Sequence, residues 1–471
     1  MNQPVEAVLA ASAQPHPRGA ASGNADALRR QMFLGFCATL EVHGFPYVIL
    51  SGYQGYPDHI DSDIDFMVSE ADFLRLPKLF SKPGVVPGAR LAQLVQYDTT
   101  ACAFVLAKQE HEHVVHLQLD FAFVTHGKFN LHTKGRPYLF YEQVLASRRL
   151  GRAGFWIPAA AVEFEYYLVK RIDKALVESR HLDQLAALLV EDPAGCRAVL
   201  ARLVPSEMQA SIIDAIAACD VAWFEQHRLE LPSMLGRRLS SETFSERMIS
   251  RGREWLRRLR RTLQPTGLVI AVLGPDGSGK TTVIEHLERE LAPAFRRVRR
   301  FHLRPHFGTA SGGAAVTDPH GQTPRGHLAS AAKVGLFILD YWMGWLRWVY
   351  PAKVRSNLVV FDRYYHDMLV DPARYRLPRG SFLQRLLAGL VPRPDIWLVL
   401  HAPPELLVAR KGEISLEAAH TLSAGYARLA QQLHAIPIDT GRGLEETLAA
   451  AVAAPLDYLA ARTAARIGSA R

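Results

Sequence analysis

The chain has 471 residues, 49% of them hydrophobic and 21% charged, which is the composition of an ordinary globular protein with room for about three domains. Four cysteines without a CxxC pair exclude a zinc ribbon and a secreted disulfide framework, so we expect a reducing, cytoplasmic setting. The formal charge of +9 suits anionic partners, but nucleotides, nucleic acid and anionic membranes meet that condition equally.

Residues 1–25 are rich in Ala, Ser, Gly and Pro and lack a basic segment, so we expect a flexible tail and no signal peptide. From residue 26 to 157, a helix with apolar side chains at four-residue spacing is followed by strands, which predicts an α+β domain. The expected strands are YVIL at 47–50, DIDFMV at 63–68, CAFVLAK at 102–108 and VVHLQLDFAF at 114–123.

Three aspartates of this region are candidates for a metal site. Asp63 and Asp65 are two residues apart on a predicted strand, so both side chains project from one face, and Asp120 on a neighbouring strand can join them. Three carboxylates repel one another without a counter-ion. Around Mg²⁺ they form the clamp used when a nucleotide α-phosphate is attacked and pyrophosphate leaves.

The same region resembles the nucleotidyltransferase fold, whose signature is a Gly-Ser pair followed a short distance later by Asp-x-Asp. Here the pair is inverted to Ser51-Gly52, so the serine expected at the triphosphate is displaced. The resemblance implies a nucleotidyltransferase-like domain in which Asp63, Asp65 and Asp120 hold the metal. A solvated strand edge or an inactive relic is the alternative.

Residues 158–263 show helical apolar spacing, and this helical domain fits the half that often follows a nucleotidyltransferase domain. Its Lys170 and Arg171 are candidates for phosphate contacts or for a solvated helix face. Its end, RGREWLRRLRRTL at 251–263, predicts a basic amphipathic helix. We expect a solvated connector there, with a membrane or RNA contact as the alternative. The apolar face carries Trp255, Leu256, Leu259 and Leu263.

At Gly267 a second pattern begins, in which apolar strands alternate with helical segments and predict a doubly wound parallel sheet within 267–471. Directly after its first strand, LVIAVL, the segment GPDGSGKT satisfies G-x-x-x-x-G-K-[ST]. This is the phosphate loop of nucleotide-binding proteins. The residues assigned to the cradle are Gly274, Gly277, Ser278, Gly279, Lys280, Thr281 and Thr282.

Each part of the loop has a physical role. Its backbone N–H groups and the following helix N-terminus attract phosphate. Lys280 is expected to reach the β- and γ-phosphates of ATP, and the Thr281 hydroxyl to bind Mg²⁺. Further along, FDRYY ends a strand with Asp362 and Arg363. Asp362 can organise magnesium, and Arg363 can grip a phosphate bidentately.

GPDGSGKTT with its Asp276, FDRYY, PDIWLVL and IPIDTGRG together resemble the thymidylate kinase-like branch of the P-loop kinases, over about Gly267–Leu448. The resemblance implies γ-phosphoryl transfer from ATP with Mg²⁺. It also implies that Arg363 lies near an acceptor phosphate, that Arg410 and Lys411 belong to a flexible lid, and that the IDTGRG turn lies near the adenine. We expect Asp276 to orient the acceptor. The segment RRFHLRPHFG departs from the family's acceptor segment and offers only Arg304, so the acceptor stays open.

The most apolar stretch is VGLFILDYWMGWLRWVY at 334–350. Asp340 and Arg347 interrupt it, and its uninterrupted part is shorter than the roughly 20 apolar residues of a membrane span. We expect a helix that is buried in the core or forms a contact between two copies of the chain. An interfacial membrane contact is the alternative.

The combined prediction is an ATP- and Mg²⁺-dependent phosphotransferase that also carries a nucleotidyltransferase-like module. Two other functions fit the same residues: an enzyme acting on a sugar or lipid precursor of surface polysaccharide, and an ATP-binding sensor or scaffold without rapid turnover. The expected partners are a nucleotide and a small-molecule acceptor, and nucleic acid is not expected. The residues given catalytic roles are Lys280, Arg363, Asp362, Asp276 and Arg410.

Overall fold

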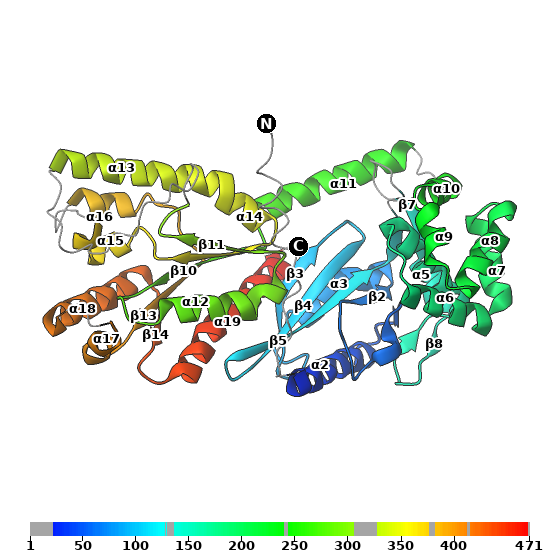
Figure 1. The fold of residues 1–471 in the computed structure, drawn as a ribbon, viewed down its shortest axis with the longest axis horizontal. Helices are drawn as coiled ribbons and strands as arrows, with labels where there is room; N and C mark the ends of the chain where they lie inside the picture. Colours follow the sequence, from blue (N-terminus) through cyan, green and yellow to red (C-terminus); the bar gives the residue numbers. More distant parts are fainter. Residues whose placement is uncertain are drawn as a thin grey trace.

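A computed structural model describes residues 22–127, 129, 136–239, 244–305, 327–375, 382–411 and 415–469. Two five-stranded sheets and a helical bundle lie in a row (Figure 1). The sheet formed by the first part of the chain lies between the other two bodies, so their order in space differs from their order in the sequence.

The first sheet has the strand order β1-β2-β5-β4-β3, in which β2 and β5 are parallel and the other neighbours antiparallel. Its apolar face packs on the helices α2 (Ser22–Val42) and α3 (Glu70–Phe80). The four expected strands form, and β3 is an additional one. The strands are β1 Tyr47–Ile49, β2 Ile64–Val68, β3 Arg90–Gln96, β4 Ala101–Glu110 and β5 His113–Ala122.

One short turn lies between β1 and β2, and further short elements connect this sheet to the helical bundle. They are the 3-10 turn η1 Tyr53–Gly55, the hairpin of β6 Val124–Gly127 and β7 Arg136–Phe140, α4 Tyr141–Ala146, and the hairpin of β8 Arg149–Leu150 and β9 Trp156–Ile157. Within the bundle, α5 packs on α6 and α7 around a core of leucine and aromatic side chains. The bundle helices are α5 Ala160–Lys174, α6 Ser179–Glu191, α7 Pro193–Leu203, α8 Ser206–Ala217, α9 Val221–Gln226 and α10 Glu230–Arg238.

The second sheet is wholly parallel, with the order β11-β12-β10-β13-β14, which confirms the predicted parallel sheet. Alternate residues of β10 enter two different cores, because successive strand side chains point to opposite faces. The helices α12 and α19 cover one face, and α13, α15, α16 and α18 cover the other. The strands are β10 Leu268–Leu273, β11 Val298–His302, β12 Leu358–Asp362, β13 Ile396–His401 and β14 Ile436–Asp439.

Helices make up most of the remainder of this region. Its elements are α12 Lys280–Leu291, η2 Ala292–Ala294, α13 His327–Gly344, a π-helical segment Trp345–Val349, α14 Tyr350–Val354, α15 Asp367–Val370, η4 Ala373–Tyr375, α16 Phe382–Ala388, α17 Pro404–Lys411, α18 Leu416–Leu433 and α19 Leu444–Ser469. The stretch expected as one apolar helix at 334–350 is therefore α13, the π-helical segment and the first residue of α14.

The last helix, α19, joins the two sheets. It packs on α12 and on β3, and the Thr463 hydroxyl donates to the Ala92 carbonyl oxygen at 3.0 Å. Ala92 and Ala107 of the first sheet belong to the same apolar cluster as Ile270 of the second. The two sheets therefore share a continuous core, and the division of the chain into separate domains stays a prediction.

A long helix, α11 (Phe244–Leu263), returns from the bundle along the first sheet towards the second (Figure 1). At the other end of the chain, α2 begins at Ser22, inside the range 1–25 expected as a tail. Ala25 packs against the first core, which explains the earlier start. Residues 1–21 lie outside the described residues. Among those described, no helix is long and apolar enough to cross a membrane.

Candidate active sites

Glycines with positive φ shape the phosphate loop between β10 and α12. A Cβ at Gly274 would lie 2.8 Å from the Leu400 carbonyl oxygen and 2.9 Å from the Ser278 hydroxyl, so no larger residue fits. Gly277 and Gly279 have φ of 83° and 80°, the left-handed region that glycine favours. This backbone turns the loop around the position that a phosphate would occupy.

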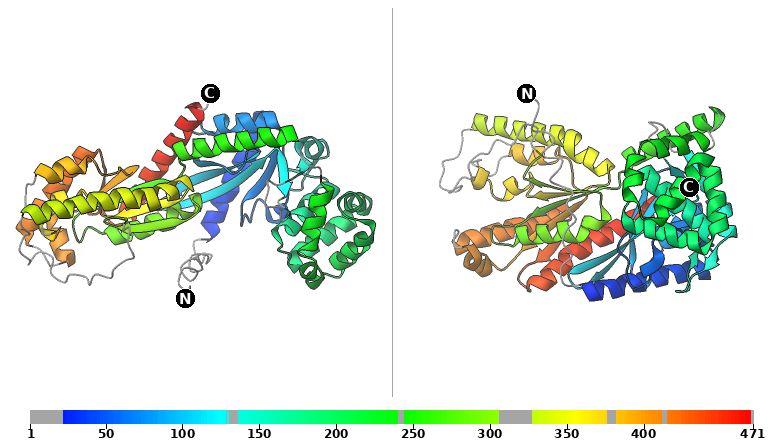
Figure 2. Two further views of the ribbon diagram at one scale, coloured as in Figure 1. Left: turned by 90° about the horizontal axis from the view of Figure 1, so that it is seen from above. Right: turned by 45° about the vertical axis from the view of Figure 1, so that its right-hand side comes forward.

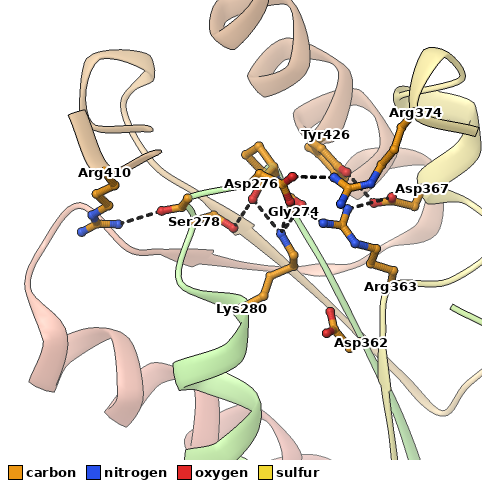
Figure 3. Close-up of polar contacts among 12 residues, drawn as sticks. Gly274, Asp276, Ser278, Lys280, Asp362, Arg363, Asp367, Arg374, Arg410 and Tyr426 are labelled. Carbon is orange, nitrogen blue, oxygen red and sulfur yellow. Dashed lines mark hydrogen bonds and ion pairs between the residues drawn. The ribbon is translucent and has the colours of Figure 1, made fainter. Parts of the chain in front are cut away.

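Lys280 is the first residue of α12, and its side chain is 8% exposed. Its Nζ donates to the carbonyl oxygens of Gly274 at 2.9 Å and Pro275 at 2.8 Å, and lies 3.5 Å from Asp276 Oδ1 (Figure 3). Burial, followed by the charge of Arg363, lowers the pKa of Lys280 to about 8. The ammonium group therefore lies inside the loop, beside the predicted phosphate position.

A cavity of about 270 Å³ opens beside the loop. Arg410 on α17 donates to the Thr440 carbonyl oxygen at 3.1 Å and to the Gly277 carbonyl oxygen at 3.4 Å, so it joins the loop to the IDTGRG turn. That turn, expected near the adenine, forms one wall of the cavity. Thr281 is exposed at the start of α12. The cavity is lined by Gly277, Ser278, Gly279, Thr282, Val283, Arg410, Thr440, Gly443, Leu444 and Thr447.

Asp276, inside the loop, is the centre of an ion-pair network (Figure 3). Its carboxylate accepts from Arg363 Nη2 and from Arg374 Nη1, the latter at 2.5 Å. Burial alone would raise the pKa of Asp276, but Arg363, Lys280 and Arg374 together hold that pKa far below its usual value. Asp276 is therefore ionised, and three cations balance its charge.

Arg363 is held between two carboxylates. Its backbone has φ of 71°, and its Nη1 donates to Asp367 Oδ2 at 3.0 Å. Asp367 is fully buried and also accepts from the hydroxyls of Tyr375, at 2.7 Å, and Tyr426. Burial opposes the charge of Arg363, but Asp367 and Asp276 raise its pKa. The network fixes the segment after β12 against the phosphate loop.

The two guanidinium groups at Asp276 differ in their access to solvent. The side chain of Arg363, which we expect near an acceptor phosphate, is 7% exposed, whereas that of Arg374 is 24% exposed. Arg374 lies on the short turn η4, and no motif marks it in the sequence. The structure therefore adds Arg374 as a second and more accessible cation at this site.

Asp362 ends β12 and lies beside Lys280 in Figure 3. Its Oδ2 is 3.4 Å from His302 Nδ1 and 3.8 Å from Arg300 Nη2, two groups of the adjacent strand β11. Burial opposes ionisation, but the hydrogen bond with His302 and its charge lower the pKa of Asp362. An ionised oxygen donor is thus present at the carboxyl edge of the sheet, where ligands bind in this architecture.

Arg304, the one equivalent that the sequence offers for an acceptor-phosphate group, is engaged elsewhere. Its Nη1 lies 2.6 Å from Asp340 Oδ2 on α13, and its guanidinium lies 4.1 Å from the ring centroid of Phe337. The insertion TASGGAAVTDPHGQTPRGH at 309–327 lies outside the described residues except for its last residue, His327. Arg304 therefore connects the segment after β11 to α13 in this structure.

A second group of carboxylates lies in the first sheet. Asp65 on β2 is in register with Asp120 on the parallel strand β5, and Asp63 immediately precedes β2. One oxygen of each lies within 4.8 Å of the other two, so the structure brings the three predicted metal ligands together. Burial is the main cause that raises the pKa of Asp120 to about 7, and Asp63 and Asp65 add to it. Asp120 lies inside β5, which continues to Ala122.

Lys170 reaches this carboxylate cluster from α5 of the helical bundle. Its Nζ donates to Asp65 Oδ2 at 2.5 Å and to the Tyr166 hydroxyl at 3.1 Å. Burial opposes its charge, but Asp65 raises the pKa of Lys170, so the ammonium stays protonated. Arg171 instead lies over the ring of Tyr167 at 4.7 Å from its centroid. Of the two phosphate-contact candidates, only Lys170 contacts the cluster.

No family model matches the chain. The chain is 30% identical over 210 residues to a thymidylate kinase of Xanthomonas oryzae pv. oryzae, which covers 42% of this chain and 88% of that protein. It is 34% identical over 152 residues to a thymidylate kinase of Xanthomonas campestris pv. campestris, covering 31% and 62% respectively. A solved thymidylate kinase structure from Candida albicans gives a TM-score of 0.29 at 16% identity, over 39% of this chain and 88% of that one, a score too low to support an argument.

Proposed function

The chain belongs to the thymidylate kinase family, and from this premise we propose that it transfers the γ-phosphoryl group of ATP to a nucleoside monophosphate or a related small acceptor. The family supports nucleotide kinase activity in general. The observation that carries the specific proposal is the convergence of Lys280, Asp276 and Arg363 at the end of β10 and β12, beside a cavity of about 270 Å³.

The proposed roles follow from position and charge. The loop N–H groups and the α12 N-terminus hold the β-phosphate, and Lys280 moves from the loop carbonyls to the γ-phosphate. Thr281 and Asp362 offer a hydroxyl and an ionised carboxylate, hard oxygen donors that suit Mg²⁺. When bound, Mg²⁺ would neutralise part of the negative charge of the ATP phosphates. Arg410 closes over the nucleotide from α17.

The acceptor is proposed to bind on the other side of the loop, where Arg374 and Arg363 converge on Asp276. Arg374 is exposed enough to exchange part of its ion pair for an acceptor phosphate. Asp276 keeps a carboxylate that can accept a hydrogen bond from an acceptor hydroxyl. Transfer then forms the bond between the acceptor oxygen and the γ-phosphorus and releases ADP.

The direct experiment is to incubate the full chain with ATP and Mg²⁺ and a set of acceptors, and to measure ADP and pyrophosphate separately. The set contains dTMP, other nucleoside monophosphates, sugar precursors and lipid precursors. Acceptor-dependent ADP supports the kinase proposal and identifies the acceptor class. ATP that stays bound and intact with every acceptor would contradict it and favour a sensor or scaffold.

A second activity, nucleotidyl transfer, is proposed for the Asp63, Asp65 and Asp120 cluster because the three carboxylates converge with a protonated lysine beside them. In that reaction an acceptor oxygen attacks the α-phosphorus and pyrophosphate leaves. Pyrophosphate release that disappears in Asp63→Asn but persists in Lys280→Ala would support it. If no nucleoside triphosphate yields pyrophosphate, the proposal that the cluster catalyses nucleotidyl transfer is wrong.

We also propose that two copies of the chain associate through α13. The described exposed side of α13 and of the π-helical segment that follows it carries large apolar groups, which is typical of homodimer contacts. Leu339→Asp is expected to convert a dimer to a monomer in analytical ultracentrifugation, and a wild-type monomer would contradict the proposal. The exposed apolar residues are Leu336, Leu339, Trp342 and Leu346. A cytoplasmic location belongs to the same proposal, in line with the free thiols of Cys37, Cys102, Cys196 and Cys219.

A further inference from the structure

The long helix α11 turns its charged side towards the protein. Glu254 pairs with Arg257 at 2.6 Å and with Arg258 at 2.9 Å. Arg257 Nη1 donates to the Gln96 carbonyl oxygen at 2.9 Å, and Arg261 Nε donates to the Val354 carbonyl oxygen at 2.7 Å. The helix is therefore attached to the first sheet and to α14 by polar contacts, the reverse of a helix that buries its apolar side.

The opposite side of α11 is apolar and exposed. Trp255 is 63% exposed and Leu263 is 69% exposed, although such residues in a surface helix ordinarily face the core. Trp255, Leu259 and Leu263 are four residues apart, and Leu256 lies three residues before Leu259. Such spacings place the side chains in one stripe along the helix. The stripe, called the α11 apolar face below, consists of Met248, Ile249, Trp255, Leu256, Leu259 and Leu263.

Exposed arginines border the α11 apolar face on both sides. Arg251 and Arg258 are seven residues apart, about two helical turns, and form one row. Arg253 and Arg260 form the other row with the same spacing. All four are exposed, while Arg257 and Arg261 lie on the inward side. An apolar face between two cationic rows is the arrangement of helices that lie in the plane of a membrane surface.

The position of α11 leaves this face accessible. Viewed from above in Figure 2, α11 lies in front of the first sheet along one long side of the molecule. Figure 1 shows it along the upper edge, between the bundle and the second sheet. The side chains of the α11 apolar face are 39% to 69% exposed, so the face is open to solvent along the helix.

We propose that α11 docks this protein on an anionic lipid bilayer, with the helix axis in the plane of the surface. The apolar face enters the acyl boundary while the two arginine rows contact lipid phosphates. A second copy fits less well, because pairing two such helices face to face brings cationic rows together. RNA binding would account for the exposed arginines, which can contact phosphates, but not for the exposed leucines between them.

The experiment is co-sedimentation of the full chain with vesicles of phosphatidylcholine, and with vesicles that also contain phosphatidylglycerol. Binding is expected to the anionic vesicles and to weaken as salt is added. Leu256→Gln with Leu259→Gln and Leu263→Gln should reduce the partition coefficient at least about tenfold. Replacing any one of Arg251, Arg253, Arg258 or Arg260 by Gln should reduce the partition coefficient about fivefold.

Two controls separate docking from general charge and from unfolding. Arg197→Gln with Arg237→Gln removes exposed charge from the bundle and should leave vesicle binding unchanged. The leucine variant should retain the wild-type rate of ADP formation and the same unfolding midpoint. Trp255 gives a local signal: the blue shift of fluorescence on anionic vesicles should be smaller in Trp255→Phe.

Three results would overturn the proposal. The first is no sedimentation with anionic vesicles. The second is a leucine variant that binds vesicles as the wild type does. The third is the absence of vesicle binding together with one of two other observations. A change of oligomeric state in the leucine variant would assign the α11 apolar face to a second copy of the chain. Binding of an RNA oligonucleotide would assign the arginines to nucleic acid.

Discussion

The guanidinium group of Arg363 donates to the carboxylate of Asp276, across the space between the end of β12 and the phosphate loop. The partner Asp367 holds the other side of the same guanidinium. Because both groups of the pair are largely withdrawn from solvent, the contact fixes the loop in relation to the strand that carries Asp362. One ion pair therefore connects the proposed ATP, metal and acceptor positions.

Replacing Asp276 by Asn should destabilise the protein, because Arg363 and Arg374 both lose a negative partner. The expected loss in the free energy of unfolding is about 3 kcal/mol, measured by urea denaturation. The KM for the acceptor should rise more than that for ATP. Asp26→Asn, which breaks the partly exposed pair with Arg29, should cost less than about 0.5 kcal/mol. Equal costs for the two variants would contradict the proposed network.

Gly274→Ala should abolish ATP binding, because the added Cβ would lie 2.8 Å from the Leu400 carbonyl oxygen and would force the loop open. Gly252→Ala is a matched control: its Cβ meets nothing within 4 Å, and Ala in a helix stabilises by about 0.5–1 kcal/mol over Gly. Isothermal titration with ATP should show no binding for the first variant and wild-type affinity for the second. Retained affinity in Gly274→Ala would mean that the loop does not hold phosphate in this form.

Stability should fall in acid partly because of His116, which joins β5 to the Glu290 carbonyl oxygen on α12. Burial lowers the pKa of His116 to about 4 against an ordinary 6.5. Between these values the unfolded chain binds a proton that the folded chain does not, so the free energy of unfolding decreases as pH falls from 6.5 to 4. The contribution is about 3 kcal/mol over that window.

The test is urea denaturation across that pH range. His116→Gln should have a shallower pH dependence than the wild type, whereas His111→Gln, at an exposed turn, should not. Glu290 raises the pKa of His116 and Arg29 lowers it, so both residues are kept in each variant. Identical slopes for His116→Gln and the wild type would rule out this origin of acid sensitivity.

The carboxylate cluster should bind a divalent cation in competition with Lys170. Mn²⁺ titration without nucleotide should show a site that Asp65→Asn weakens at least about tenfold, because one anionic ligand is lost. Lys170→Gln should tighten the same site, since the ammonium no longer neutralises Asp65. Asp58→Asn, in the preceding loop and paired with Arg30, should change nothing. Weaker binding in Lys170→Gln would mean that the lysine supports the metal.

Local patterns in the sequence predict the phosphate loop and the aspartate cluster. Gly274 and Lys280 belong to a motif whose geometry is set by its own backbone. The sequence places Asp63 and Asp65 on one face of a strand by the two-residue period. The parallel pairing that puts Asp65 in register with Asp120 is seen only in the structure. Arg374 has no such signal, since the packing of η4 against the buried Asp367 brings it to Asp276.

The fold beyond these motifs depends on contacts between distant segments. The strand β3 escapes prediction because a bulge between Leu91 and Gln93 interrupts its alternation. The helix α19 is rich in Ala on several sides, and only the structure shows that it packs on both sheets. Likewise, the amphipathic pattern of α11 predicts two faces but not that the charged one turns inward.

The measurement that tests the central claim most directly is the rate of acceptor-dependent ADP formation in Lys280→Ala. Loss of the Lys280 ammonium group should lower kcat by about a hundredfold or more, with circular dichroism and the unfolding midpoint close to the wild type. A properly folded Lys280→Ala protein that forms ADP at a rate within a few-fold of the wild type would contradict the assignment of a kinase site to this loop.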